Sequence, residues 1–149
     1  ASGLHDPASG RLQKEQRPAR RLGAPILARV VSTATTGVPP ELMGIGPISA
    51  TQKTLAKAGL TVGDMDLFEI NEAFAAQCVA CQRTLGIDMD KLNVNGDGIS
   101  LGHPVGATGA RIVISLLYEL KRRGGRYGVT TLCAGGMGTA VLIEVPKEG

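Results

Sequence analysis

Residues 93–110 read NVNGDGISLGHPVGATGA, with five glycines around a single histidine, His103. Glycine allows a positive φ and lets a ligand approach the backbone closely, so this density is typical of a tight functional loop. Apolar residues of helical character follow at once, in Ala110–Leu120. We therefore expect a loop that presents His103 ahead of a helix, although a single histidine in such a loop is more often a solvated surface residue.

Strand and helix patterns alternate on both sides of this loop. The expected strands are 26–35, 67–70, 92–95, 127–132 and 139–145, and the expected helices are 48–58, 72–85 and 110–120. Ser49 or Thr51 is the candidate N-cap of the first helix, and glycines at 59, 86 and 124 follow the three helices. The third helix is apolar on nearly every side, so we expect it to be buried on both faces, between two sheets. The order β-α-β-α-β-α-β-β predicts an α/β domain that ends in a hairpin.

The composition favours one globular domain in a reducing compartment. The chain has 149 residues, is 43% hydrophobic, and has three cysteines and no apolar run near the ~18 residues that a membrane span needs. An odd number of cysteines does not make a disulfide framework, so we expect a cytoplasmic protein outside the membrane. The first residue is Ala1, which suggests a fragment or a processed product.

The net charge of +3 comes from the start of the chain. Residues 1–22 hold five basic and two acidic side chains, whereas the remaining residues hold eleven of each sign. A basic arm can bind nucleic acid or a phosphate, but this one lacks interleaved aromatic residues and a recognisable module. We expect no nucleic-acid partner, and we treat 1–22 as an atypical basic leader, disordered or degenerate, ahead of a domain at 23–149.

Three polar points fall at strand ends or tight loops, which is where α/β folds place their chemistry. They are Asn71 with Glu72, His103, and Cys133 before a glycine-rich turn. Each has a structural explanation when taken singly. Asn71 could be a helix N-cap, Glu72 a first-turn charge, and Cys133 a small buried hydrophobe.

Taken together, these motifs resemble those of the thiolase C-terminal domain. They are Asn71-Glu72-Ala73-Phe74, then Asn95-Gly96 through Gly102-His103-Pro104-Val105-Gly106-Ala107-Thr108-Gly109-Ala110-Arg111, then Leu132-Cys133-Ala134-Gly135-Gly136-Met137-Gly138. The resemblance extends from about Gly23 to Val145 and implies the C-terminal half of a thiolase-like fold, a mixed sheet with helices on both faces. It implies reversible Claisen condensation of acetyl-CoA and thiolytic cleavage of 3-ketoacyl-CoA through an acyl-enzyme.

The resemblance also implies roles for individual residues. His103 would activate a nucleophilic cysteine of the absent N-terminal domain and, with a water held by Asn71, bind the thioester oxygen. Cys133 would be the second acid/base, and we expect it where a dipole or partner favours the thiolate. Backbone amides at Gly135 or Gly136 would form an oxyanion hole, with Gly102 and Glu72 in the substrate loop. Coenzyme A would be a substrate, with no bound cofactor, and the complete protein would be a homodimer or homotetramer.

The sequence departs from the family pattern at three places. Family members commonly have one more glycine after the position of Cys133, and Asp97 stands where glycine is usual, which could shift or weaken the site. Pro7–Arg21 replaces an expected strand and helix, although Ala1–Asp6 resembles the family's opening motif. Our hypothesis is a local reading-frame error or a degenerate segment, so His5 is not a functional candidate.

Other classes of function fit less well. Cys78 and Cys81 have the spacing of a redox dithiol or half a zinc site, but they fall mid-helix without a second ligand pair, which favours helix packing. The glycine loop fails the dinucleotide fingerprint, because Leu101 stands where glycine is required. We expect neither metal nor NAD. The alternatives to an acyltransferase fragment are a non-catalytic thiolase-like module that binds a partner domain or CoA, and then a ketoacyl synthase relative.

Overall fold

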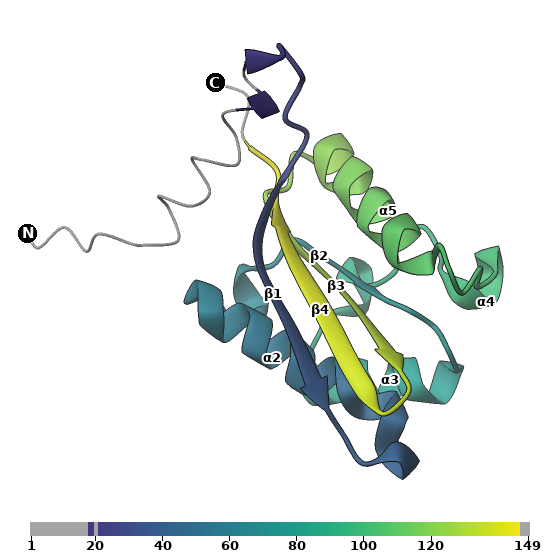
Figure 1. Cartoon of the computed structure of the whole chain (residues 1–149). Helices are drawn as coiled ribbons and strands as arrows, with labels where there is room; N and C mark the ends of the chain where they lie inside the picture. The colour runs from purple at the N-terminus through teal and green to yellow at the C-terminus, as the bar shows by residue number, and fades with distance from the viewer. Residues whose placement is uncertain (1–17, 20, 147–149) are drawn as a thin grey trace, which may run out of the picture.

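A four-stranded mixed sheet forms the centre of the computed structural model, which describes residues 18–19 and 21–146. The strands are β1 (Arg29–Gly37), β2 (Leu67–Ile70), β3 (Tyr127–Ala134) and β4 (Met137–Glu144). They lie in the order β1-β4-β3-β2, with β2 and β3 parallel and the other pairs antiparallel (Figure 1). The expected mixed sheet and closing hairpin are confirmed. Most of the basic leader, with His5 and Pro7–Arg17, lies outside the described residues.

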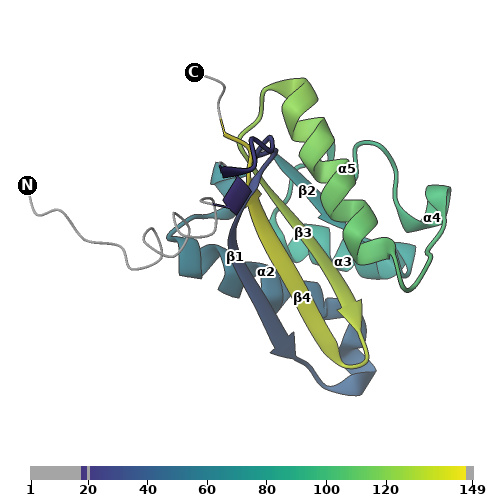
Figure 2. The same ribbon diagram turned by 45° about the horizontal axis from the view of Figure 1, so that its top comes forward.

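Helices cover both faces of this sheet. The longer helices are α2 (Gly46–Ala58), α3 (Ala75–Leu85) and α5 (Thr108–Arg123), and the shorter ones are α4 (Gly98–Leu101) and the 3₁₀ turns η1 (Pro40–Ile45), η2 (Val62–Asp64) and η3 (Met89–Lys91). Figure 2 shows α2 and α3 behind the sheet and α5 in front of it. Phe68 and Leu142 pack with α2 and α3, whereas Leu67 and Ile143 pack with α5. Neighbouring residues of a strand thus contribute to two separate apolar cores.

The expected helix ends are confirmed more closely than the helix starts. Gly59, Gly86 and Gly124 all end their helices in the left-handed conformation. Neither proposed N-cap of α2 is right, because that helix already begins at Gly46, after η1.

The expected strand at 92–95 is wrong. It is reduced to one isolated bridge between Leu92 and Phe68, because the chain turns away at Asn93, which has a φ of 47°.

The third helix is not buried on both faces. Its inner side packs on the sheet through Ile112, Leu116 and Leu120, which are at most 1% exposed. Its outer side leaves Ile114 55% and Tyr118 57% exposed. The apolar pattern predicts the inner face, but the expectation of burial on both faces is wrong for the described chain.

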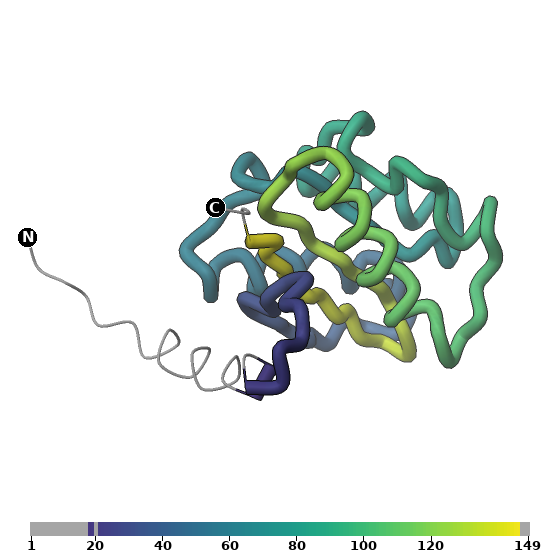
Figure 3. Tube along the Cα trace, turned by 90° about the horizontal axis from the view of Figure 1, so that it is seen from above, coloured from purple at the N-terminus to yellow at the C-terminus, as the bar shows by residue number. Residues whose placement is uncertain are grey.

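The two ends of the described chain lie together, since Arg29 at the start of β1 pairs with Glu144 at the end of β4 (Figure 3). At the other end of the sheet, the backbone of α2 touches β4. A Cβ built on Gly138 would lie 1.9 Å from the carbonyl oxygen of Gly46, and a Cβ on Gly46 would lie 2.7 Å from the amide nitrogen of Gly138. Both positions therefore require glycine for steric reasons alone. This contact fixes the start of α2 against the strand that follows the glycine turn.

We predict that Gly138→Ala destabilises the domain by about 3 kcal/mol or more, because the new methyl meets backbone atoms that cannot move independently. The measurement is urea-induced unfolding of wild type and variant. Gly37→Ala is the matched control in the same sheet, since nothing lies within 4 Å of its added Cβ. A cost for Gly138→Ala no larger than that of the control would contradict the contact.

Candidate active site

Three segments of the chain meet where the parallel strands β2 and β3 end. Asn71 follows β2, and its backbone N–H donates to the carbonyl of Thr131 at 2.9 Å. Cys133 lies two residues further along β3. The first turn of α5 packs against the residue between them, because a Cβ built on Gly109 would contact Leu132 Cδ2 at 3.7 Å. The loop that carries His103 leads directly into that turn, so the sequence motifs come together at one edge of the sheet.

Asn71 is buried and carries an unused acceptor. Its side chain is 2% exposed, and Oδ1 has no hydrogen-bond partner within the described residues. That oxygen faces the loop, 3.5 Å from the place of a Cβ on Gly98. Asn71 is not a helix N-cap, because α3 begins only at Ala75, after Phe74. An amide in this position can bind a water or a ligand at the edge of the sheet.

Glu72 attaches the glycine loop to this edge. One carboxylate oxygen accepts from the backbone N–H of Ile99 at 3.0 Å, and the other accepts from Asn93 Nδ2 at 3.3 Å. The interpretation of Glu72 as a first-turn helix charge is wrong, since it precedes α3 by three residues. Its contacts hold α4, the short helix that ends just before Gly102 and His103.

Asp97 makes the second connection between the loop and the strand end. Its side chain is completely buried, and Oδ2 accepts from the backbone N–H of Glu72 at 2.7 Å. The other oxygen, Oδ1, forms an ion pair with Arg111 of α5 at 2.5 Å. Both oxygens are thus partnered, as a buried carboxylate requires. This residue, which departs from the family pattern, is built into the loop rather than projecting into the site.

His103 lies between Gly102 and the start of α5, with its ring exposed at the molecular surface. Its Nδ1 is 2.7 Å from the hydroxyl of Thr108. Gly102 has a φ of 91°, a conformation that favours glycine just before the histidine. The ring is thereby held on one side and open on the other.

Cys133 is buried near the end of β3, 8% exposed. Burial raises the pKa of its thiol above the ordinary value. The expectation of a thiolate-favouring environment is therefore not met in this chain, and the group is a neutral thiol near pH 7. The turn after it is a two-residue hairpin of Gly135 and Gly136, with φ of 55° and 79°, in which the Gly136 carbonyl accepts from Val38 N–H at 2.8 Å.

Sequence reasoning missed the residues that support the site. Asn93 pairs its carboxamide with both the N–H and the C=O of Ile70, at 2.8 and 2.9 Å, and so takes the place of a neighbouring strand. Arg111 and Thr108 contact Asp97 and His103, as described above. Asparagine is enriched at positive φ, so Asn93 carried a weak signal. The contact between Arg111 and Asp97 spans 14 residues and carried none.

The two helical cysteines belong to the core. Cys78 and Cys81 are buried free thiols in α3, and burial raises the pKa of Cys78 to about 11. This supports the helix-packing interpretation over a redox dithiol. Within residues 18–19 and 21–146, no three His, Cys, Asp or Glu side chains gather as metal ligands, and no helix is long and apolar enough to cross a membrane.

A second buried carboxyl, Glu69, lies beneath the site on β2. It is 2% exposed, and its Oε2 has no partner among the described residues. Burial raises its pKa to about 8, and the negative charges of Asp97, Glu72 and Glu119 add to the rise. The positive charge of Arg111 opposes it. Glu69 is therefore protonated at neutral pH.

Comparison with known proteins gives one consistent family. Residues 24–145 match the family model "Thiolase, C-terminal domain". An acetyl-CoA acetyltransferase of Syntrophomonas wolfei is 52% identical over 147 residues, covering 97% of this chain and 37% of that protein. The peroxisomal 3-ketoacyl-CoA thiolase B of Mus musculus is 53% identical, covering 98% of this chain and 35% of its own length.

Solved structures agree with these relatives. The crystal structure of the Bacillus anthracis acetyl-CoA acetyltransferase superposes with a TM-score of 0.86 at 50% identity, covering 88% of this chain and 34% of that one. Human mitochondrial 3-ketoacyl-CoA thiolase in complex with CoA gives the same TM-score at 47% identity, covering 88% of this chain and 34% of that one. The chain thus spans little more than a third of the length of these relatives.

We predict that the buried carboxyl makes the domain less stable as pH rises. The folded state keeps the Glu69 proton up to about pH 8, whereas the unfolded chain loses it near 4.5, so the free energy of unfolding falls between these values. Glu69→Gln should remove this loss, on the order of a few kcal/mol. Urea unfolding at about pH 5.5 and about pH 8.5 measures it, and an equal pH dependence in wild type and variant would contradict the prediction.

Proposed function

The chain belongs to the thiolase family as its C-terminal domain, and we propose that it supplies half of an acyltransferase active site. The reaction is reversible Claisen condensation of acetyl-CoA and thiolytic cleavage of 3-ketoacyl-CoA. The observation that carries this proposal is the convergence of Asn71, the His103 loop and Cys133 at the end of β2 and β3. The alternatives in which each residue acts only as a cap or a surface charge account for none of this convergence.

The proposed chemistry needs a base and hydrogen-bond donors around a thioester. A carbanion beside a thioester requires proton transfer at carbon and stabilisation of charge at oxygen. We propose that His103 removes the thiol proton of a nucleophilic cysteine, which the rest of the protein supplies. Asn71 holds a water that, together with the His103 ring, binds the thioester oxygen. The buried amide with its unpartnered Oδ1 supports this assignment.

We assign to Cys133 the proton transfer at the α-carbon. In cleavage, the bond between the α- and β-carbons breaks, its electron pair passes to the leaving acetyl-CoA enolate, and the Cys133 thiol protonates that carbon. A neutral thiol suits this donor role, and the raised pKa of Cys133 supports it. In condensation the same sulfur must first lose its proton, which its raised pKa disfavours.

The glycine-rich turns complete the proposed site. We assign to the backbone amides of Gly135 and Gly136, two and three residues after Cys133, the stabilisation of oxyanion charge on a tetrahedral intermediate. Gly102 and Glu72 form the substrate loop, Gly102 through its backbone and Glu72 through the Ile99 amide. Coenzyme A enters as substrate, and we propose no bound cofactor.

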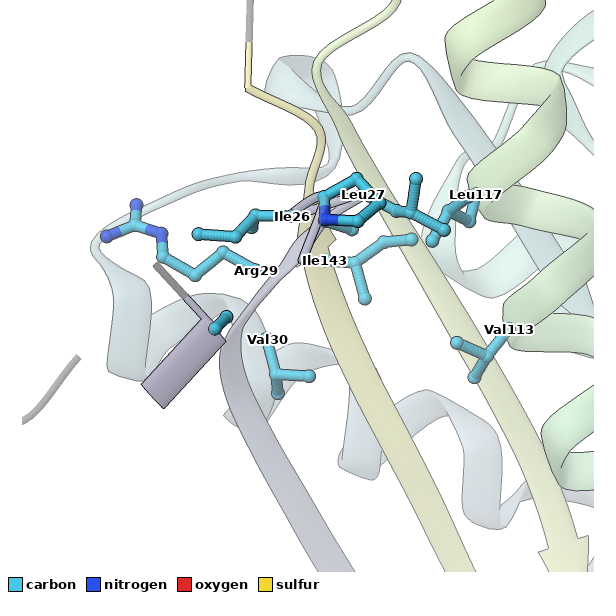
Figure 4. Close-up of a pocket in the computed structure, with 10 residues that line it drawn as sticks. Ile26, Leu27, Arg29, Val30, Val113, Leu117 and Ile143 are labelled. Carbon is cyan, nitrogen blue, oxygen red and sulfur yellow. The ribbon is translucent and has the colours of Figure 1, made fainter. Parts of the chain in front are cut away.

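The remaining two thirds of the relatives' length suggest the main partner, an N-terminal thiolase domain. Its docking surface is an apolar strip along α5, here called the α5 open face: exposed Ile114 and Tyr118 and half-buried Val113 and Leu117. Val113 and Leu117 also line a hollow of about 450 Å³, whose other apolar walls include Leu27, Val30 and Ile143 (Figure 4). An apolar helix face of this size is normally covered. We further propose a homodimer or homotetramer for the complete protein and a cytoplasmic location, although relatives include peroxisomal and mitochondrial thiolases.

We predict that the native product is heavier than 15.4 kDa on an immunoblot of source extract.

The purified product should cleave acetoacetyl-CoA in the presence of CoA, and His103→Ala or Cys133→Ala should each lower the rate by about 10²- to 10⁴-fold. Lys53→Ala, at an exposed position on α2, is the control and should retain activity. A product of 15.4 kDa without thiolysis would favour the non-catalytic module that binds a partner domain or CoA.

We also predict that this chain, produced alone, self-associates through the α5 open face. Ile114→Lys and Tyr118→Lys should shift it toward monomer in sedimentation experiments, because a buried lysine charge opposes association. Val79→Lys places the same charge at an exposed apolar position on α3, across the sheet, and should leave association unchanged. A monodisperse wild-type monomer with a sharp melting transition would overturn this prediction.

A further inference from the structure

The hydroxyl of Thr108 lies between the His103 ring and a backbone carbonyl. It is 2.7 Å from Nδ1 of His103 and 3.1 Å from the carbonyl oxygen of Pro104. Thr108 is the first residue of α5 and is 2% exposed, so its side chain is enclosed by protein. Its rotamer therefore places one oxygen against two polar groups that belong to the same loop.

A threonine hydroxyl has one proton to give and lone pairs to accept with. Pro104 stands four residues before Thr108, the spacing at which threonine hydroxyls donate back to the helix backbone. With its proton directed at Pro104, the oxygen presents only lone pairs to the His103 ring. Nδ1 must then carry a proton for the 2.7 Å contact to be a hydrogen bond.

We propose that Thr108 is a positioning residue that holds neutral His103 in the tautomer protonated on Nδ1, which leaves the lone pair of Nε2 on the open side of the ring. This inference rests on the proposed function, which needs His103 as a base. It adds the identity of the group that selects the reactive nitrogen. A ring protonated on Nε2 instead has no lone pair there and cannot take a proton from a thiol on that side.

The selected tautomer serves two successive steps. Nε2 first takes the thiol proton, so that the sulfur keeps its electron pair as thiolate and the ring becomes an imidazolium. The new Nε2–H then donates to the thioester oxygen where charge develops. One nitrogen thus acts as base and then as donor, while Nδ1 stays bonded to Thr108 throughout.

The surroundings hold Thr108 in place independently of the histidine. The backbone N–H groups of Ala107 and Thr108 donate to Pro104 at 2.7 and 2.9 Å, which fixes the turn. Three residues later, Arg111 anchors the same helix turn to buried Asp97. The hydroxyl is therefore part of a rigid support.

The test is the ¹⁵N spectrum of the His103 imidazole in this 149-residue chain. The chain has two histidines, so His5→Ala leaves His103 as the only one to observe. In neutral, substrate-free protein we expect a pyrrole-type ¹⁵N shift for Nδ1 and a pyridine-type shift for Nε2. The opposite assignment, or the averaged shifts of a tautomer mixture, would overturn the proposal without any variant of Thr108.

Variants then assign the effect to the hydroxyl. Thr108→Val keeps the shape but removes the acceptor, and should return the ring to the averaged shifts of a solvated imidazole. Thr108→Ser restores the hydroxyl and should restore the wild-type pattern. Thr33→Val, at an exposed strand position, is the control and should change nothing. A Thr108→Val spectrum identical to wild type would overturn the proposal, and if that variant fails to fold, the wild-type and Thr108→Ser spectra decide.

This measurement separates the two proposals. The tautomer is observed without substrate or partner, so a chain that lacks thiolase activity but shows Nδ1–H counts only against the proposed function. An active enzyme whose His103 carries its proton on Nε2 counts only against the role of Thr108.

Discussion

The buried carboxylate of Asp97 is the contact on which the geometry of the site depends. It joins the turn after β2, through the backbone of Glu72, to α5, through Arg111. A completely buried charge is tolerated only when its partners are in place, and removing one partner of such a pair typically costs about 3–5 kcal/mol. Because Arg111 remains partly exposed, the cost here falls toward the lower end or below. The loop that carries His103 therefore has one favoured position relative to Asn71.

This arrangement has an electrostatic consequence beneath the site. Asp97 pairs with Arg111, whereas Glu69 has no cation partner of its own among the described residues. Burial raises the pKa of Glu69, and the negative charge of Asp97 adds to the rise. The protonated carboxyl can then donate a hydrogen bond in a region where Asn71 and Glu69 both keep unpartnered oxygens. Polar groups left unsatisfied in this way are uncommon in stable cores and concentrate where a protein binds something. The region around Glu69 and Asn71, beneath the proposed site, is therefore less stable than an apolar core would be.

The sequence predicted those features that depend on neighbouring residues. The helix ends at Gly59, Gly86 and Gly124 and the closing hairpin follow from local patterns. The parallel pairing of β2 with β3, which brings Asn71 near Cys133, was not predicted. The supporting contacts of Asp97 and of Asn93 join residues 14 to 25 positions apart, and no periodicity specifies them. Asp97 was expected to shift or weaken the site, because it adds a carboxylate and a Cβ where the family has glycine. Only the folded chain brings Arg111 to it.

The two proposed acid/base groups differ in how complete their surroundings are. Cys133 is already enclosed by this chain, and its raised pKa reflects that enclosure. His103 is supported on its Nδ1 side by Thr108 and is open on the other side, which faces away from the domain's own core. The α5 open face is exposed as well, and in the proposed docking the N-terminal domain covers both. A partner that covers α5 also removes water from around the His103 ring, and in a drier site the same hydrogen bonds act more strongly on developing charge. The proposed docking would therefore be coupled to the proposed catalysis through α5, whose first residue contacts the histidine and whose outer side carries the proposed docking surface.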